Sequence, residues 1–231
     1  IWAFLIWRVK FPAETDNTVK SSDKKNDGHG HFSKLILYPH FIKGIIAQFF
    51  YVGAQVGTWS FLIQYIKDFL QKPEKEAGVY LVYTLLAFGI GRFVSTALMR
   101  KIQPNKLMGT FSVINIILTG MAVLHPGFLG AWSLVISSFF MSCMFPTIFA
   151  LGVKGLGPNT KIGGSMIIMA IIGGAIWTPL MGYISDTTHS MAYAMLIPLT
   201  SYVYLVYYSF IGSKPSGPLY EGEEYKVVAS H

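Results

Sequence analysis

The sequence predicts an all-α integral membrane protein with six transmembrane helices, and three observations carry this prediction. Of its 231 residues, 52% are hydrophobic, and only 13% carry a charge. A soluble domain averages about 25% charged residues, because a surface in contact with water needs them and a surface in contact with lipid does not. The third observation is a series of long apolar runs, each close to the roughly 20 residues that cross a bilayer.

The apolar runs recur from Gly44 onward and are separated by short polar connectors. We expect each run to form one transmembrane helix, with the runs together making a single bundle over residues 44–212. The predicted spans are 44–66, 77–99, 106–124, 127–151, 163–185 and 192–212.

Three segments lie outside this predicted bundle. Residues 1–7 are apolar, and we interpret them as the last turns of a further transmembrane helix. Residues 8–43 mix charges of both signs without apolar periodicity, which predicts a polar linker. Residues 213–231 combine prolines, glycines and an acidic cluster, which predicts a disordered tail.

The basic residues are distributed unevenly between the two sides of the predicted bundle. The side with the fewer has only Lys67, Lys72 and Lys75, offset by nearby acids, and Arg92 lies within a span. All other Lys and Arg residues belong to the linker, the tail and the two connectors on their side. The positive-inside rule therefore places the linker and the tail in the cytoplasm of a multi-pass protein of the inner (plasma) membrane. This location accounts for the net charge of +7 without a nucleic acid partner.

The first span has a polar stripe on one face. At 100° per residue, Gln48, Gln55 and Trp59 fall within about 40° of arc, with Tyr51 at the edge of the stripe. Side-chain amides hydrogen-bond vicinal hydroxyls, and an aromatic plane stacks on a pyranose ring, so the stripe suits a sugar. The alternative is that the glutamines bond neighbouring helices.

The fourth and fifth spans contain residues that bend helices or bring them close together. Pro146 removes a backbone donor and predicts a kink beside Phe145, which we expect to line a substrate cavity. Gly173 and Gly174 permit a close approach or sliding of a neighbouring helix. Trp177 faces the same way as Gly173, and we expect it to line the substrate cavity as well. Packing alone is the alternative for the kink and for Trp177.

Charged groups are scarce within the spans. Arg92 is costly there, so we expect an ion pair or a helix-end clamp at a cytoplasmic gate, with simple snorkelling as the alternative. No Asp or Glu lies deep in any predicted span, and the histidines fall in connectors or tails. The sequence has no phosphate loop and no nucleophile–base arrangement. We therefore expect neither an enzyme nor a metal or organic cofactor.

Several motifs, taken in order, resemble a known family. They are Tyr51-Val-Gly-Ala-Gln55, Trp59-Ser60, Gly91-Arg92-Phe93, Pro146-Thr147-Ile148-Phe149, Ile171-Ile172-Gly173-Gly174, Thr178-Pro179 and Ser185-Asp186. In this order they resemble the fucose/galactose/glucose–proton symporters of the major facilitator superfamily, which include the L-fucose permeases. The resemblance extends from about residue 38 to residue 212.

The resemblance implies a twelve-helix transporter of which this chain is the C-terminal half, with residues 1–7 ending helix 6. It implies proton-coupled uptake of a hexose or deoxyhexose by alternating access, with the proton as coupling ion. The first and fourth helices of each half line the cavity in this family, and its proton-carrying carboxylates belong to the N-terminal half, which would be the main partner here. Phe145 stands where the fucose symporter has tyrosine, which leaves glucose or galactose open.

Two other interpretations remain at this point. The chain is also consistent with half of a major facilitator transporter for another solute, such as a nucleoside or a drug. It is equally consistent with a membrane scaffold or sensor that transports nothing.

Overall fold

The computed structural model describes residues 35–221 and 224–228 and confirms the six-helix membrane fold. Its membrane-length helical segments are Pro39–Leu70, Glu74–Leu98, Pro104–Leu124, Phe128–Gly152, Gly157–Thr188 and Met191–Gly212. The first begins five residues before the predicted start at 44, because Pro39 fits the first turn of a helix. The predictions for residues 1–34 lie outside the described residues.

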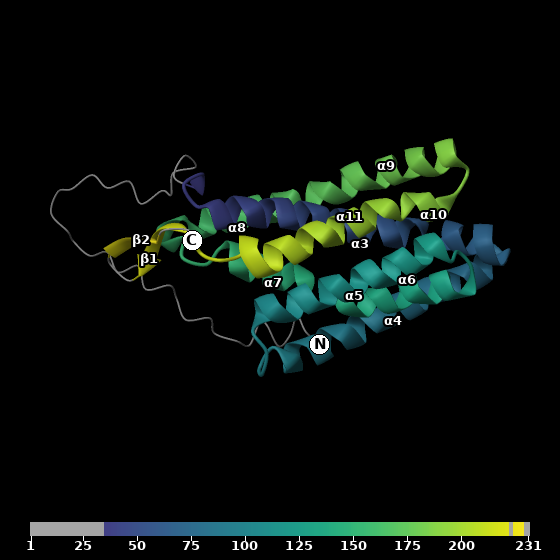
Figure 1. The fold of residues 1–231 in the computed structure, drawn as a ribbon, viewed down its shortest axis with the longest axis horizontal. Coiled ribbons are helices and arrows are strands. Elements are labelled where there is room, and N and C mark those ends of the chain that lie inside the picture. Colours follow the sequence, from purple (N-terminus) through teal and green to yellow (C-terminus); the bar gives the residue numbers. More distant parts are fainter. Residues whose placement is uncertain (1–34, 222–223, 229–231) are drawn as a thin grey trace, which may run out of the picture.

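The first three spans are uninterrupted helices, and the last three are broken. The uninterrupted ones are α3 (Pro39–Leu70), α4 (Glu74–Leu98) and α5 (Pro104–Leu124). The fourth span consists of α6 (Phe128–Met141) and α7 (Met144–Gly152). The fifth runs through η1 (Gly157–Asn159), α8 (Thr160–Met169), η2 (Ala170–Ile172) and α9 (Gly173–Thr188), and the sixth through α10 (Met191–Ala194), α11 (Leu196–Tyr207) and the π-helix η3 (Tyr208–Gly212). Figure 1 shows the spans lying side by side along the long axis of the molecule.

The break in the fourth span follows from Pro146. Proline has no backbone N–H, so the carbonyl of Ser142, four residues earlier, loses its usual helical donor. The helix is interrupted at Ser142 and Cys143, where the Ser142 N–H donates instead to the Phe139 carbonyl, three residues back. The predicted kink is therefore a complete interruption between α6 and α7.

Glycines let α9 cross α3 at very short range. A Cβ on Gly173 would lie 2.1 Å from the Phe49 carbonyl oxygen, and a Cβ on Gly53 would lie 1.6 Å from the Trp177 ring. A Cβ on Gly174 would likewise lie 3.1 Å from a methyl carbon of Val56. The glycine pair predicted to allow close helix approach thus lies directly on α3.

The two ends of the bundle differ in charge. The end that we call the basic end has, among residues 35–216, Lys43, Arg100, Lys101, Lys106, Lys154, Lys161 and Lys214, and no Asp or Glu. The opposite end has Asp68, Glu74, Glu76 and Asp186 as well as lysines. There Lys72 donates to Glu76 at 2.8 Å. This hydrogen bond raises the pKa of Lys72 above its usual value.

The described residues after the last span include a hairpin, in a segment for which the sequence predicts disorder. Strand β1 (Gly217–Glu221) pairs antiparallel with β2 (Glu224–Val228), and Figure 1 shows this hairpin beyond the basic end. Ser213 and Ser216, which precede it, are both buried. This segment is held by contacts with the bundle. An argument from local composition does not include such contacts.

The spans are buried to different degrees. About half of each hydrophobic window is buried in the first, third, fourth and sixth spans, against 22% in α4 and 28% in the fifth span. Large apolar side chains such as Ile90, Phe93 and Met169 are exposed on these two spans. An apolar surface of this kind suits lipid or another apolar helix rather than water.

Two glycines of α4 provide a matched test of the α4–α6 packing. A Cβ on Gly91 would lie 2.3 Å from the Phe139 carbonyl oxygen, whereas a Cβ on Gly89 meets nothing within 4 Å. Gly91→Ala should therefore lower the free energy of unfolding by about 1–3 kcal/mol, the usual cost of overpacking. Gly89→Ala should leave it unchanged or raise it by up to about 1 kcal/mol through helix propensity. Unfolding in detergent, followed by circular dichroism, measures both, and equal effects would refute the close approach.

Candidate functional site

The stripe predicted on the first span faces the fourth span. The Tyr51 hydroxyl donates to the Met141 carbonyl at 3.0 Å, and Trp59 Nε1 donates to Ser138 Oγ at 3.1 Å. Both bonds join α3 to α6, one of them immediately before the break in the fourth span. The stripe therefore fixes the position of α6 relative to α3 and fixes the plane of the Trp59 ring.

Gln48 lies at the enclosed end of this stripe. Its side chain is completely buried, and neither its amide nitrogen nor its amide oxygen has a hydrogen-bond partner among the described residues. A buried amide without partners is costly, so it marks a place where water or another polar group would be stabilising. The alternative, in which the glutamines bond neighbouring helices, is not seen for Gln48 within the described part of the chain.

The other half of the stripe is more open. Gln55 and Trp59 are partly buried, whereas Tyr51 is fully buried, as Gln48 is. The stripe thus runs from inside the bundle to a position that is accessible from outside it. Of the predicted stripe residues, Gln55 and Trp59 are the two that are partly exposed.

Two phenylalanines complete the surroundings of the accessible residues. The ring of Phe88, on α4, lies 5.1 Å from the Trp59 ring and nearly perpendicular to it. The ring of Phe145, on α7, lies 6.4 Å from that of Tyr51, edge to face. Sequence reasoning found Phe145 through its neighbour Pro146 but missed Phe88, because a phenylalanine in an apolar helix gives no distinguishing signal.

Trp177 lies away from this group. It packs on Phe49 and Phe50, with ring centroids 5.5 Å apart in each pair, and against Gly53. Gly53 is about 140° around α3 from Gln48, so Trp177 contacts the other side of the helix from the stripe. This placement favours the packing alternative for Trp177, together with Gly173 and Gly174.

Arg92 is exposed and lies over an aromatic ring. Its guanidinium carbon is 5.5 Å from the centroid of Phe88, a distance at which a cation and a ring face attract. It forms no salt bridge with any residue in the described part of the chain. Arg92, Phe88 and Trp59 therefore form a continuous series of contacts, with Phe88 in the middle.

The fold and this geometry define a bundle of six membrane-length helices, and comparison with known proteins shows its family. The family model described as Major Facilitator Superfamily matches residues 1–161. The "L-fucose-proton symporter" of Escherichia coli is 40% identical over 200 residues, which are 85% of this chain and 45% of the relative. The "Glucose/galactose transporter" of Brucella abortus is 36% identical over 216 residues, covering 93% of this chain and 51% of the relative.

Solved structures give the same result. The crystal structure of the E. coli fucose:proton symporter FucP matches with a TM-score of 0.80 and 37% identity, over 90% of this chain and 50% of FucP. A structure of FucP in the outward conformation matches with a TM-score of 0.79. The chain belongs to the major facilitator superfamily. It spans about half the length of the relatives that it matches.

Two tyrosines distinguish a residue of the site from one that only holds helices together. The Tyr51 hydroxyl bonds the Met141 carbonyl, and the Tyr65 hydroxyl bonds the Ala122 carbonyl at 2.7 Å near the opposite end. Tyr51→Phe and Tyr65→Phe should each lower the free energy of unfolding by about 1 kcal/mol, because each removes one buried hydrogen bond. Only Tyr51→Phe should also weaken sugar binding, because it frees the end of α6 beside Phe145. Unfolding and equilibrium sugar binding in detergent measure these effects, and equal loss of binding in both variants would exclude a specific role for Tyr51.

Proposed function

We propose that this chain is the C-terminal half of a proton-coupled transporter for a hexose or deoxyhexose. The observation that carries the proposal is that Trp59, one turn from the partly exposed Gln55, packs edge to face on Phe88, while Tyr51 of the same helix packs on Phe145. An accessible amide beside fixed aromatic rings has the chemistry that a pyranose needs. Relatives whose names specify fucose, glucose or galactose support the sugar class.

The Trp59 indole is prepared for stacking on a sugar. Its N–H is already bonded to Ser138, and Phe88 meets it edge to face, so the ring is held before a substrate arrives. Binding then loses little side-chain entropy, which favours affinity. The Gln55 amide would supply both a donor and an acceptor to vicinal hydroxyls. Phe145 offers a ring without a hydroxyl, which leaves glucose or galactose open beside fucose.

The N-terminal six-helix half would pack on the least buried spans. Those spans, α4 and α8–α9, expose apolar side chains along much of their length. Rocking of the two halves about the group around Trp59 would expose the sugar alternately to the two sides of the membrane. Arg92, which lies over Phe88, would sense this motion because its ring partner contacts the site directly.

The coupling proton would be carried outside this chain. Among residues 35–216 the acids are Asp68, Glu74, Glu76 and Asp186, and all of them are near the opposite end of the bundle. None is beside Gln55 or Trp59, so a carboxylate of the other half would be required. The relative named as a fucose-proton symporter supports proton coupling.

Replacement of Gln55 tests the site. In membrane vesicles with an imposed proton gradient, Gln55→Ala should lower hexose uptake at least tenfold, because the sugar loses hydrogen bonds that a small apolar residue does not replace. Gln64→Ala is the matched control: the same helix and side chain, but exposed and bonded to Asp68. Uptake of fucose, glucose and galactose should be measured with and without a protonophore.

Two results of that experiment would contradict the proposal. Unchanged uptake of every hexose in Gln55→Ala would remove the amide from the site. Uptake that is insensitive to the protonophore would refute proton coupling. Transport of nucleosides or drugs, with no hexose transported, would favour another branch of the superfamily.

The basic end is proposed to face the cytoplasm, and single cysteines test this orientation. The native Cys143 is buried, so added cysteines report separately. Lys72→Cys should react with a membrane-impermeant maleimide in intact cells, whereas Lys161→Cys should react only after permeabilisation, because the positive-inside rule places the basic end inside. The opposite labelling pattern would invert the proposed orientation.

A further inference from the structure

A pocket of about 530 Å³ lies at the basic end, where three segments distant in sequence meet. They are the start of α5, the end of α7 with the turn after it, and the chain immediately after η3. The polar residues that line the pocket are Gln103, Asn105, Thr147, Lys154, Ser213 and Lys214. We propose that this pocket binds the phosphate group of a small anionic ligand.

The charge of the lining selects an anion. Lys154 and Lys214 are the two charged residues that line the pocket, and both are lysines. Among residues 35–216 no Asp or Glu lies at this end to neutralise them. In the hairpin beyond, Glu221 pairs with Glu224 at the turn, which is the end remote from Gly217 and the pocket. The two ammonium groups therefore lack a nearby acidic partner in the described bundle, and a phosphate would supply one.

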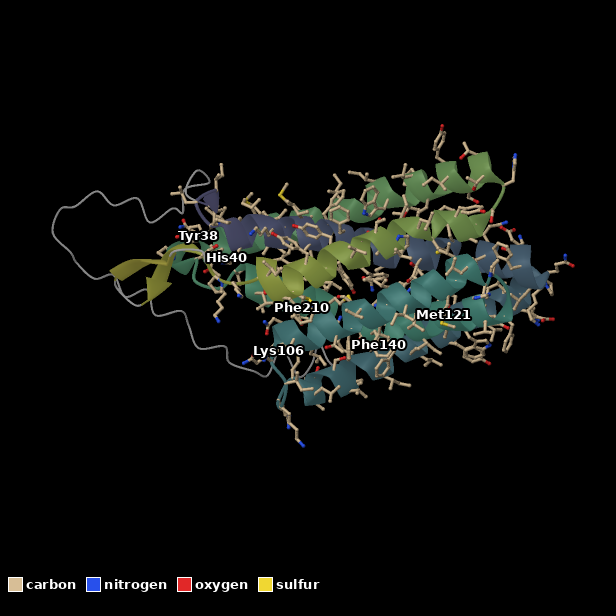
Figure 2. All side chains as sticks on the ribbon, in the orientation of Figure 1. Tyr38, His40, Lys106, Met121, Phe140 and Phe210 are labelled. Carbon is tan, nitrogen blue, oxygen red and sulfur yellow. The ribbon has the colours of Figure 1, made fainter. Side chains whose placement is uncertain are left out.

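A buried histidine holds both lysine-bearing segments in place. His40, at the start of α3, is fully buried; its Nε2 donates to the Lys154 carbonyl at 2.9 Å, and its Nδ1 accepts from the Ser216 N–H at 3.3 Å. The tautomer with the proton on Nε2 satisfies both bonds. Figure 2 shows His40 at the end of the bundle next to the hairpin, the same end at which Lys106 lies. One side chain thus fixes the backbone on both sides of the pocket, so the site is formed before a ligand binds.

A second link holds the third segment. The Ser209 hydroxyl donates to the Asn105 carbonyl at 2.6 Å, and the Ser213 hydroxyl donates to the Ser209 carbonyl at 2.9 Å. These bonds tie the first turn of α5 to the chain that leaves η3. The pocket walls are therefore connected by hydrogen bonds on two sides, whereas the Lys154 and Lys214 side chains stay exposed and able to reach a ligand.

The N-terminus of α5 lies at the pocket, so its positive potential adds to the charge of the lysines. Its first turn has Pro104 at the start, no acidic residue, and no side-chain cap from Gln103. The free backbone N–H groups of a helix start and the helix dipole both favour an anion. The lysines and the pocket carry the proposal, and the helix end strengthens it.

The volume indicates more than a bare ion. About 530 Å³ is well above the roughly 30 Å³ that one water occupies in the liquid, so a phosphate with an attached organic group fits. Such a group comes either from a soluble phosphate ester in the cytoplasm or from the headgroup of an anionic lipid. The phosphate chemistry is the same in both cases, and an experiment separates the sources.

Removal of the two lysines tests the pocket. The protein is purified as its gene encodes it, in a neutral detergent, and titrated by calorimetry with inorganic phosphate and with a hexose phosphate. Lys154→Ala/Lys214→Ala should weaken binding at least tenfold, because a phosphate loses two charge-assisted hydrogen bonds. Lys161→Ala is the matched control, since Lys161 is exposed at the same end but does not line the pocket. All three lysines are exposed, so the replacements leave the packed bundle intact.

A second experiment, with lipid, decides the source of the phosphate. The same variants are placed in nanodiscs of neutral lipid or of neutral lipid with phosphatidylglycerol, and co-purified lipid is counted after delipidation. Retention of phosphatidylglycerol that falls in the double variant, but not in Lys161→Ala, assigns the pocket to a lipid headgroup. Saturable binding of the soluble esters with the same dependence assigns it to a metabolite. If neither ligand binds, or the double variant and Lys161→Ala behave alike in both arms, the proposal is wrong. Binding is the readout, so this result does not depend on whether the protein transports a sugar.

Discussion

The position of α3 inside the bundle is the constraint on which the rest of the structure depends. A helix in lipid must gain its neighbours by close packing and by interhelical hydrogen bonds, because lipid supplies no hydrophobic drive between helices. Helix α3 uses small residues on one side, where Gly53 and Gly173 bring it against α9, and polar bonds on the other, where Tyr51 and Trp59 reach α6. The first side sets how close the helices lie, and the second sets which part of α6 faces the site.

Hydropathy was enough to predict the spans, because the length of an apolar run is a local property of the sequence and the bilayer thickness sets that length. The faces of α3 were also predictable, since 100° per residue places Gln48, Gln55 and Trp59 together. The neighbouring helix that each face contacts was not predictable. The periodicity that groups the stripe gives no indication of Phe88. Trp177, which was expected to line the cavity, packs against α3 beside Phe49 and Gly53.

The tail shows a second limit of local reasoning. Prolines and glycines between 213 and 218 do predict an end to the helix, which η3 confirms at Gly212. The composition does not reveal that His40, over 170 residues earlier, receives the Ser216 N–H. A bond between positions so distant is invisible in a sequence window, although a histidine directly after Pro39, at the start of an apolar helix, is a polar group that needs partners once it is buried.

The uneven distribution of basic residues bears on both the membrane orientation and the proposed anion site. Positive residues gathered at one end orient the helices, but they also repel one another, and among residues 35–216 that end has no acid to offset them. Lysines spread along the rim meet an anion singly, whereas two lysines that line one pocket can both bond the same phosphate. The asymmetry that is proposed to set the topology would therefore also favour an anion in the pocket between Lys154 and Lys214. The proposed site around Trp59 has the opposite character, because its fixed rings and neutral amide would suit a solute without charge.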